Sequence, residues 1–328
     1  MLLPLDIQNK VFSKSLTGYD KNEVDTFLDE VFFNYESLYK DSFALKDKVA
    51  NLEECLSVYK NMEHTMQEAI VVAQKAAEDV KRSAEEKAEV IKFSKKVING
   101  RTQWIIGTGG NCTANAQKST AFAEEVGADA VLVVTPYYNK CTQNGLVEYY
   151  GAIRKVTKLP IISYNVPGRT GVNILPSTFA KAVKLGYVDA IKEASGNISQ
   201  ISEVARLIEE ELDNKAVLYS GDDGITLPVM AVGGKGVISV LANPLPKAMK
   251  ALTDACLKGE WEKARKLQLA LNPFVSALFM EVNPIPVKAA CSMLGLCENV
   301  MRSPLTTLEE GNYGKLKSAL DKAMSITL

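Results

Sequence analysis

The stretch DAIKEASGN, Asp189–Asn197, indicates more about the fold and chemistry of this chain than any other. It continues a short, mostly apolar run, Tyr187–Ile191, that is typical of a buried strand, and it breaks at a Ser-Gly-Asn turn. Burying Lys192 costs free energy unless its amine is paired or deprotonated. The residue is therefore either an amine of lowered pKa that forms a Schiff base, or an ordinary lysine that extends to water. The stretch by itself favours the ordinary lysine, and the surrounding pattern reverses that preference.

Short apolar runs alternate with helical segments on both sides of this stretch. Strands are predicted at 104–106, 130–134, 160–163, 187–191, 217–220 and 236–241, with helices between them and a helical tail from Pro246. Continuous apolar strands that alternate with helices are typical of a parallel sheet covered on both faces. The pattern predicts an α/β fold, an incomplete TIM (β/α)8 barrel of about six parallel strands plus C-terminal helices, preceded by a long coiled-coil helix.

Polar side chains collect just after the predicted strands, where the active sites of such barrels lie. They are Thr108, Tyr137, Tyr138, Tyr164, Arg169, Lys192, Asp222 and Asn243. Each has an ordinary interpretation as a loop or surface residue. Together they supply an amine, hydroxyl groups that can move protons, and a cation that can hold a carboxylate. This combination predicts a Schiff-base aldol reaction on a keto acid.

Composition narrows the classes of protein further. The 328 residues are enough for about two domains, and 47% of them are hydrophobic, which allows a sizeable core. A net charge of -1 argues against a nucleic-acid partner. Six cysteines without a C-x-x-C pair, and a single histidine, argue against a zinc site and fit a reducing compartment. We expect a cytoplasmic protein, since neither a signal peptide nor a membrane span is recognisable.

Seven short motifs recur through the second part of the chain. They are Gly107–Gly109, Thr135–Lys140 (TPYYNK), Tyr164–Gly171 (YNVPGRTG), Ile191–Asn197, Gly221–Asp223, Gly236–Val240 and Asn283–Lys288 (NPIPVK). In this combination they resemble the dihydrodipicolinate synthase family over residues 84–328. The resemblance implies a class I aldolase-type lyase that condenses pyruvate with L-aspartate 4-semialdehyde in lysine and diaminopimelate biosynthesis. It also implies a covalent Schiff base with pyruvate and no cofactor.

The resemblance implies catalytic roles for three residues. Lys192 would form the Schiff base with pyruvate. Tyr164 would relay protons and position the substrate, and Tyr138 would reach into the site of a neighbouring subunit to complete the relay. The family's tetramer contacts are therefore expected here too.

Binding roles follow from the same resemblance. Arg169 and Gly168 would bind substrate at the entrance, with Arg169 holding the carboxylate of the aspartate semialdehyde. Ile238 would line the pyruvate pocket. A lysine inhibitor would sit between subunits at Asn111 and Tyr137.

The family's opening segment has no recognisable counterpart in this chain. That segment comprises a strand, a helix, a second strand and a Gly-Thr-Thr-Gly-Glu turn, whose threonine links two tyrosines in the proton relay. We therefore expect a barrel without two of its strands, and impaired turnover.

A heptad pattern occupies the first part of the chain. Asp20 and Glu23 predict a capping box at the start of a long helix, and Gly100 predicts its end. One apolar seam is Val24, Val31, Leu38, Leu45, Leu52, Tyr59 and Met66, and the other is Leu28, Tyr35, Ser42, Val49, Leu56, Glu63 and Ile70. A period of 3.5 residues sustained over this length predicts a coiled coil.

Four motifs in this part resemble the bacterial division protein DivIVA over residues 1–83. They are Leu5–Lys10, Gly18–Asp20, Glu23–Leu28 and Ala69–Glu78. The resemblance implies a parallel coiled-coil dimer that touches the cell membrane or division septum through an exposed apolar residue, here Leu16, followed by Thr17. The predicted domains are thus 1–83 and 84–328. Two alternatives to an enzyme stay open: a coiled-coil polarity scaffold, and a non-physiological gene chimera.

Overall fold

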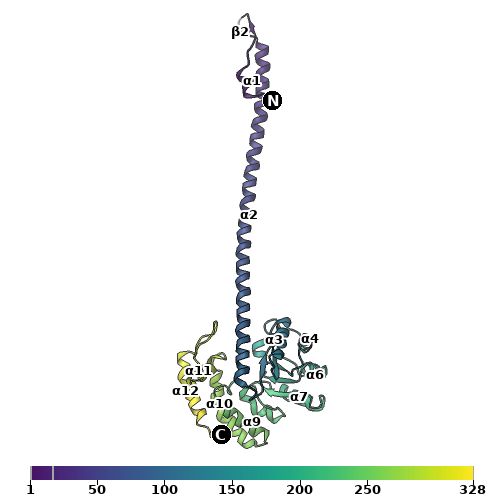
Figure 1. Cartoon of the computed structure of the whole chain (residues 1–328), viewed down its shortest axis with the longest axis vertical. Helices are drawn as coiled ribbons and strands as arrows, with labels where there is room; N and C mark the ends of the chain where they lie inside the picture. The colour runs from purple at the N-terminus through teal and green to yellow at the C-terminus, as the bar shows by residue number, and fades with distance from the viewer. Residues whose placement is uncertain (1, 17, 328) are drawn as a thin grey trace. The chain divides into compact units, whose positions relative to one another are not determined.

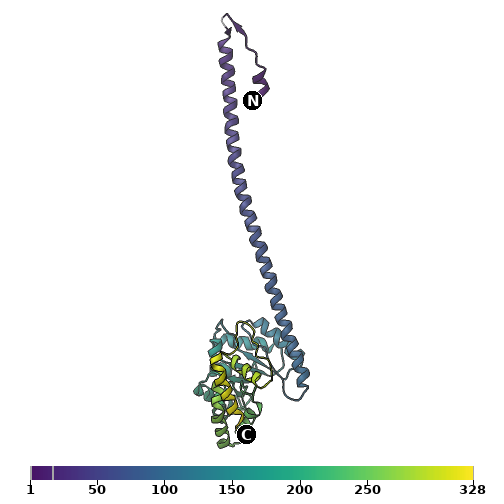
Figure 2. The ribbon, with the colours of Figure 1, turned by 90° about the vertical axis from the view of Figure 1, so that its left-hand side faces the viewer.

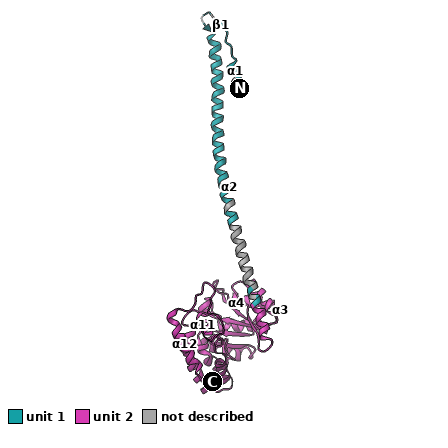
Figure 3. Cartoon of the chain, turned by 60° about the vertical axis from the view of Figure 1, so that its left-hand side comes forward, with its two compact units in different colours: residues 1–89 teal, residues 90–328 magenta. Residues whose placement is uncertain are grey.

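The computed structural model of the chain describes residues 2–16 and 18–327, and their side chains except those of 4, 15, 63, 64, 69–85 and 87. The chain forms two compact units, Met1–Glu89 and Val90–Leu328, coloured separately in Figure 3. Thr17 and the side chains of Glu63 and Ile70 lie outside the described residues. None of the helices in the described part combines the length and apolar character that a membrane span requires.

The first unit begins with a helix and a hairpin, α1 (Pro4–Gln8), β1 (Lys14–Ser15) and β2 (Gly18–Tyr19), that precede α2 (Lys21–Ile98). β1 and β2 pair antiparallel, and Figure 2 shows α1 beside the first part of α2. The Phe12 ring contacts the Phe27 ring edge-on, with 5.5 Å between centroids. The Nζ of Lys10 lies 5.3 Å from the Phe27 centroid. These contacts fasten the hairpin to the first turns of α2.

The capping box predicted at the start of α2 is half right. The Asp20 carboxylate accepts hydrogen bonds from the amides of Asn22 (2.9 Å) and Glu23 (3.2 Å), as an N-cap residue does. The Glu23 carboxylate, however, does not bond back to the Asp20 amide. It accepts from the Ser13 amide at 3.0 Å and pairs with Lys10 Nζ at 3.3 Å, because Asp20 N–H already donates to Ser13 O. Glu23 therefore anchors the hairpin.

The predicted end of α2 is confirmed. The helix stops at Ile98, and Asn99 and Gly100 then take positive φ values of 46° and 70°. Arg101 donates from its guanidinium to the carbonyl oxygens of Val97 (2.7 Å) and Ile98 (3.2 Å), so free carbonyls at the helix end are satisfied.

A parallel sheet forms the centre of the second unit. Its strands, in spatial order, are β3 (Ile105–Gly107), β4 (Ala130–Val134), β5 (Ile161–Asn165), β6 (Ala190–Glu193) and β7 (Val217–Ser220). The strand predicted at 236–241 is wrong, since that segment makes only one bridge, from Val237 to Ser220. The amides of Val240 and Leu241 donate to the Asp223 carboxylate instead, which turns the chain away from the sheet edge.

Helices bury one face of this sheet, which we call the outer face. They are α3 (Thr113–Glu125), α4 (Gln143–Arg154), α6 (Pro176–Lys184) and α7 (Ile198–Glu210). Val131, Val133, Ile161 and Ile191 point to this side and are fully buried among the helices. The alternation along each strand places the other residues on the inner face, where Ala130, Ile162 and Ala190 form a separate cluster with Leu132, Tyr219 and Ile238.

The C-terminal helices make a second core. They are α8 (Thr226–Ala231), α9 (Pro246–Leu257), α10 (Trp261–Leu278), α11 (Ile285–Met293) and α12 (Glu310–Met324). Leu252, Leu271 and Phe274 are buried among them. Figure 1 shows α9, α10, α11 and α12 gathered on one side of the unit, and α3, α4, α6 and α7 on the other.

Candidate active site

Lys192 lies within β6 and not at its end. The strand runs from Ala190 to Glu193, later than the predicted 187–191, because Asp189 closes the preceding loop. The Asp189 carboxylate accepts from the Ile161 amide at 2.7 Å and forms an ion pair with Arg154. The sheet register then places Lys192 directly between Tyr164 on β5 and Tyr219 on β7. All three side chains therefore project from the inner face.

The amine of Lys192 is held away from water. Lys192 is only 9% exposed, and its Nζ lies 4.2 Å from the centroid of the Tyr164 ring. Burial lowers the pKa of Lys192 from 10.5 to about 8, and the Asp223 carboxylate opposes part of that shift. Gly221 provides the room, since a Cβ there would lie 3.1 Å from Lys192 Cε and 2.7 Å from Ala194 Cβ.

A pocket of about 390 Å³ is lined by Tyr164, the residue whose ring contacts this amine. Its lining includes Tyr164, Arg169 and Tyr137, together with Gly107, Gly109, Leu132, Val134, Val166 and Thr170. Burial raises the pKa of Tyr164, and the Arg169 charge opposes this. Tyr164 thus stays a protonated hydroxyl between a weakly basic amine and a fixed cation, which is an arrangement suited to proton transfer.

Arg169 stands at the mouth of the pocket. It belongs to the short helix α5 (Pro167–Thr170) after β5, and its side chain is exposed. Both terminal guanidinium nitrogens donate to the Asn283 carbonyl oxygen at 3.4 Å. These long bonds fix the fork while leaving N–H groups for an anionic ligand. Gly168, beside it, has no atom within 4 Å of the place where a Cβ would stand, so the entrance is open there.

Tyr138, Ile238 and Asn111, three other predicted site residues, differ in exposure and in their contacts. Tyr138 is 90% exposed and has a positive φ of 71°, an uncommon conformation for a residue with a side chain. Ile238 packs against the inner-face cluster, and its amide donates to Ser220 O at 2.9 Å. Asn111 is exposed, and its carbonyl oxygen accepts from Asn139 Nδ2 at 2.8 Å.

Some polar residues at the strand ends have structural roles. Thr108 is buried and accepts a hydrogen bond from Thr120 at 2.8 Å. Asp222 caps the 3₁₀ turn that follows β7, since its carboxylate accepts from the Gly224 amide at 2.8 Å. Asn243 donates to Val240 O at 2.9 Å. The sequence grouped these three with the reactive residues only because they follow strands.

Two buried carboxylates near Lys192 were missed by the sequence analysis. Asp223 is almost fully buried; one oxygen accepts from Val240 and Leu241, and Oδ1 has no partner among the described residues. Glu193 accepts from Asn165 Nδ2 at 2.9 Å and from the Ser195 amide at 2.7 Å, which braces β6 against β5. The Gly-Asp-Asp turn was the available signal for Asp223.

A buried lysine of lowered pKa, on the inner face of a parallel α/β sheet and next to a tyrosine and an arginine, defines the class of Schiff-base-forming aldolases. Residues 49–323 match the model of the dihydrodipicolinate synthetase family, and the chain belongs to that family. The match begins within α2, before the predicted boundary at 84, and this boundary stays a prediction.

Known proteins of high similarity agree with this assignment. The chain is 48% identical over 255 residues to 4-hydroxy-tetrahydrodipicolinate synthase of Alkaliphilus oremlandii, covering 78% of this chain and 87% of that protein. It is 47% identical over 253 residues to the enzyme of the same name from Geobacter sulfurreducens, covering 77% and 86%. Among solved structures, dihydrodipicolinate synthase from Aquifex aeolicus has a TM-score of 0.70 at 45% identity, covering 73% of this chain and 80% of that one.

Proposed function

We propose that this chain acts as a 4-hydroxy-tetrahydrodipicolinate synthase, a class I aldolase-type lyase that joins pyruvate to L-aspartate 4-semialdehyde in lysine and diaminopimelate biosynthesis. The observation that carries the proposal is the Lys192 amine, buried against the Tyr164 ring with a pKa lowered to about 8. An amine of that pKa is neutral often enough near neutral pH to attack a ketone.

The reaction follows from the placement of three side chains. Neutral Lys192 Nζ adds to the keto carbon of pyruvate, and loss of water leaves a protonated imine. Loss of a methyl proton gives an enamine, which attacks the aldehyde carbon of the second substrate and forms the new carbon–carbon bond. The amine of that substrate then adds to the regenerated imine carbon, which closes the ring and releases the Lys192 amine. Tyr164 moves protons between these steps, and Arg169 holds the carboxylate of the aldehyde. The covalent imine acts as the electron sink, so the proposal includes no metal or cofactor.

Trapping with borohydride tests the proposal directly. Pyruvate and borohydride should add a pyruvate-derived mass to the peptide that contains Lys192, and Lys192→Ala should abolish that mass. Lys235→Ala, which removes an exposed lysine of the same unit, serves as the matched control and should leave the adduct unchanged. An adduct that persists in Lys192→Ala, or that never forms in the unaltered chain, would refute the assignment.

Turnover is expected to be slow even if the adduct forms. Thr170 lines the pocket, but its hydroxyl donates to Val172 O at 3.0 Å and is engaged there. It is therefore a poor substitute for a relay threonine between tyrosines, and an incomplete proton relay costs about 10²–10⁴-fold in rate. Synthase activity equal to that of the Alkaliphilus enzyme, measured side by side, would contradict this part of the proposal.

The site is completed, in the same proposal, by a second copy of the chain. Tyr138 is almost fully exposed and held at a positive φ, which fits a side chain that projects into a neighbouring subunit. Replacing it with Phe should slow turnover while leaving the borohydride adduct intact. The lysine inhibitor position, at Asn111 and Tyr137, belongs to the same proposed interface and is tested by the effect of lysine on turnover.

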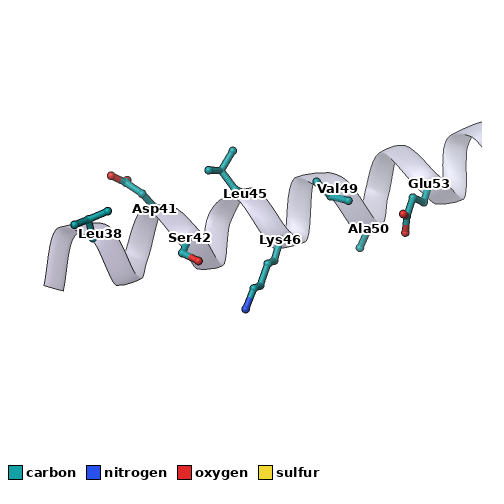
Figure 4. Close-up of a pocket in the computed structure, with 8 residues that line it drawn as sticks. All are labelled: Leu38, Asp41, Ser42, Leu45, Lys46, Val49, Ala50 and Glu53. Atoms are coloured by element: carbon teal, nitrogen blue, oxygen red, sulfur yellow. The ribbon is translucent and has the colours of Figure 1, made fainter. Parts of the chain in front are cut away.

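The N-terminal part, 1–83, favours a second role, that of a DivIVA-like association module. Figure 4 shows part of α2, where a shallow groove is lined by Leu38, Leu45 and Val49 with Asp41, Ser42, Lys46, Ala50 and Glu53. Leu38, Leu45 and Val49 are each more than half exposed. In a parallel pair of helices, residues that flank the seam face partners five positions further along. Asp41 would then face Lys46 of the second copy, and Lys48 would face Glu53.

These opposite charges support one occupant for the groove, a second α2 helix in parallel and in register. Two consecutive pairs of opposite sign favour that arrangement over a shifted one, in which like charges would meet. The proposed product is a coiled-coil dimer, and its test is the oligomeric state of the full chain.

The hairpin between β1 and β2 gives the same module a proposed membrane contact. Leu16 at its tip is fully exposed (103%). The Lys10 amine already forms an ion pair with Glu23 and lies over two aromatic rings. Lys14 is therefore the cation expected to face anionic lipid. Leu16→Ser should reduce co-sedimentation with anionic vesicles, whereas Val11→Ser, also at an exposed site, should not. Equal loss in both variants would contradict a specific tip.

A further inference from the structure

Two cysteines line the wall of a second cavity, which lies in the C-terminal region. Cys291 lies in the last turn of α11, and Cys297 follows the end of that helix. Both line a cavity of about 320 Å³ together with Asn283 and Lys288, and with Val240, Asn243, Pro284 and Val287. The proposed reaction of Lys192 uses neither thiol.

The turn that ends α11 brings Cys297 back toward the last turns of that helix. The Leu296 amide donates to Cys291 O at 3.0 Å, and the Gly295 amide donates to Ser292 O at 2.9 Å, with Gly295 at a φ of 70°. These two bonds make a Schellman turn, which reverses the chain over the last turn of the helix. Cys297 Sγ consequently lies 3.9 Å from Lys288 O.

Helix geometry places the other sulfur over the same residues. Side chains of an α-helix lean toward its N-terminus, so that of Cys291 lies over the turn that contains Lys288. Burial raises the pKa of Cys291, and the nearness of Cys297 raises it further. Cys297 itself is exposed to solvent. The Cys297 thiol is thus accessible to reagents in solvent, whereas the Cys291 thiol is less accessible.

We propose that Cys291 and Cys297 form a reversible intrachain disulfide, a redox site for glutathione-type disulfides in the wall of this cavity. The Cys297 thiolate attacks one sulfur of oxidised glutathione, which breaks that disulfide and releases one reduced glutathione. Cys291 loses its proton and attacks Cys297 Sγ, which releases the second. The two thiols give up two electrons, and their two protons end on the two reduced glutathione molecules.

Peptide mapping of the full chain tests the proposal independently of enzyme activity. Trypsin cleaves after Lys288 and Arg302, so both cysteines fall in one peptide, 289–302. After equilibration with oxidised glutathione and alkylation, that peptide should carry no alkyl group and be lighter by two hydrogen atoms than its reduced form. Dithiothreitol should restore two alkylatable thiols. Cys112, an exposed thiol elsewhere in the same unit, is the internal control and should carry glutathione.

Two variants separate the attacking thiol from the resolving one. Cys291→Ser should trap Cys297 as its glutathione adduct, whereas Cys297→Ser should leave Cys291 modified more slowly than Cys112. Cys112→Ser should not change the behaviour of peptide 289–302. Two free thiols under conditions that modify Cys112, or two separate glutathione adducts on peptide 289–302 of the unaltered chain, would overturn the proposal.

Discussion

The seam of α2 and the outer face of the sheet contain the same kinds of apolar residue, which are exposed on the seam and buried on the outer face. Ile161 and Ile191 on the outer face are fully buried by helices of the same chain, whereas Leu45 and Leu52 on the seam are each 62% exposed. A sheet between helices completes its core within one chain, and a single heptad helix cannot. The comparison shows that the second unit buries its apolar residues within one chain, whereas the seam of the first unit leaves them exposed.

The largest effect should come from breaking the seam. Leu45→Asp together with Leu52→Asp places two charges where the proposed partner helix packs. The double substitution should dissociate the proposed coiled coil. Sedimentation of the full chain measures this. Ala44→Asp together with Asn51→Asp adds the same charge on residues that do not line the groove, and should leave association unchanged. Identical sedimentation of both double variants would disprove the seam as an interface.

A truncation of one aromatic side chain in each unit sharpens the contrast. Phe274 is 1% exposed among the C-terminal helices, and Phe274→Ala should lower the free energy of unfolding of the second unit by about 3–5 kcal/mol. Phe33 is 72% exposed on α2, and Phe33→Ala should change the free energy of unfolding of the first unit by no more than about 0.5 kcal/mol. Denaturant unfolding followed by circular dichroism gives both values. Comparable losses would show that Phe33 is buried in a way the described structure does not contain.

Within the sheet, hydrogen exchange should be faster at the β3 edge than at the centre. β3 pairs with β4 alone in the described residues, and Thr108 N–H donates to Leu132 O. Because N–H directions alternate along a strand, the Ile105 amide faces away from β4. Its hydrogen exchange should be about tenfold or more faster than that of Ile191, whose strand has a neighbour on each side. Equal protection would mean that a further strand, from this chain or a second copy, covers the edge.

The smallest expected effect concerns the pKa of Lys192. Adduct formation with pyruvate should rise with pH around a midpoint of about 8, since only the neutral amine attacks. The Asp223 carboxylate stabilises the protonated amine, so Asp223→Asn should move the midpoint below that of the unaltered chain. The asparagine keeps an acceptor oxygen for Val240 and Leu241. Asp213→Asn, at an exposed site, controls for net charge, and an upward shift in Asp223→Asn would contradict the stated cause.

The linkage of this pKa to stability has a defined sign. Lys192 binds its proton more weakly in the folded chain than its ordinary value of 10.5 implies, so folding is penalised while the amine must be charged. This penalty is fully present below about pH 8 and fades as pH rises toward 10.5. The contribution of Lys192 to stability therefore increases with pH over that window.

Prediction from the sequence was most accurate where local pattern alone decides structure. The strands at Ala130–Val134 and Val217–Ser220 were predicted to the residue, and the end of α2 followed from its Asn-Gly pair. The segment at 236–241 has an equally strand-like sequence but bonds to Asp223, a tertiary partner that no local pattern contains. Lys192, Tyr164 and Arg169 were predicted as a group. In the structure Tyr164 and Arg169 line one pocket, and Lys192 Nζ lies 4.2 Å from the centroid of the Tyr164 ring; their catalytic roles stay a prediction.

The sequence by itself determined the class of fold, the family motifs and the lysine that matters, because hydrophobic period and motif spacing are written locally. Only the tertiary structure decided how that lysine is tuned. The pKa of Lys192 on β6 depends on its burial beside Gly221 and the Tyr164 ring and on the buried carboxylate of Asp223. Tyr164 belongs to β5, whereas Gly221 and Asp223 follow β7. Desolvation and charge act through space over a few ångströms, so groups distant in the chain set them together.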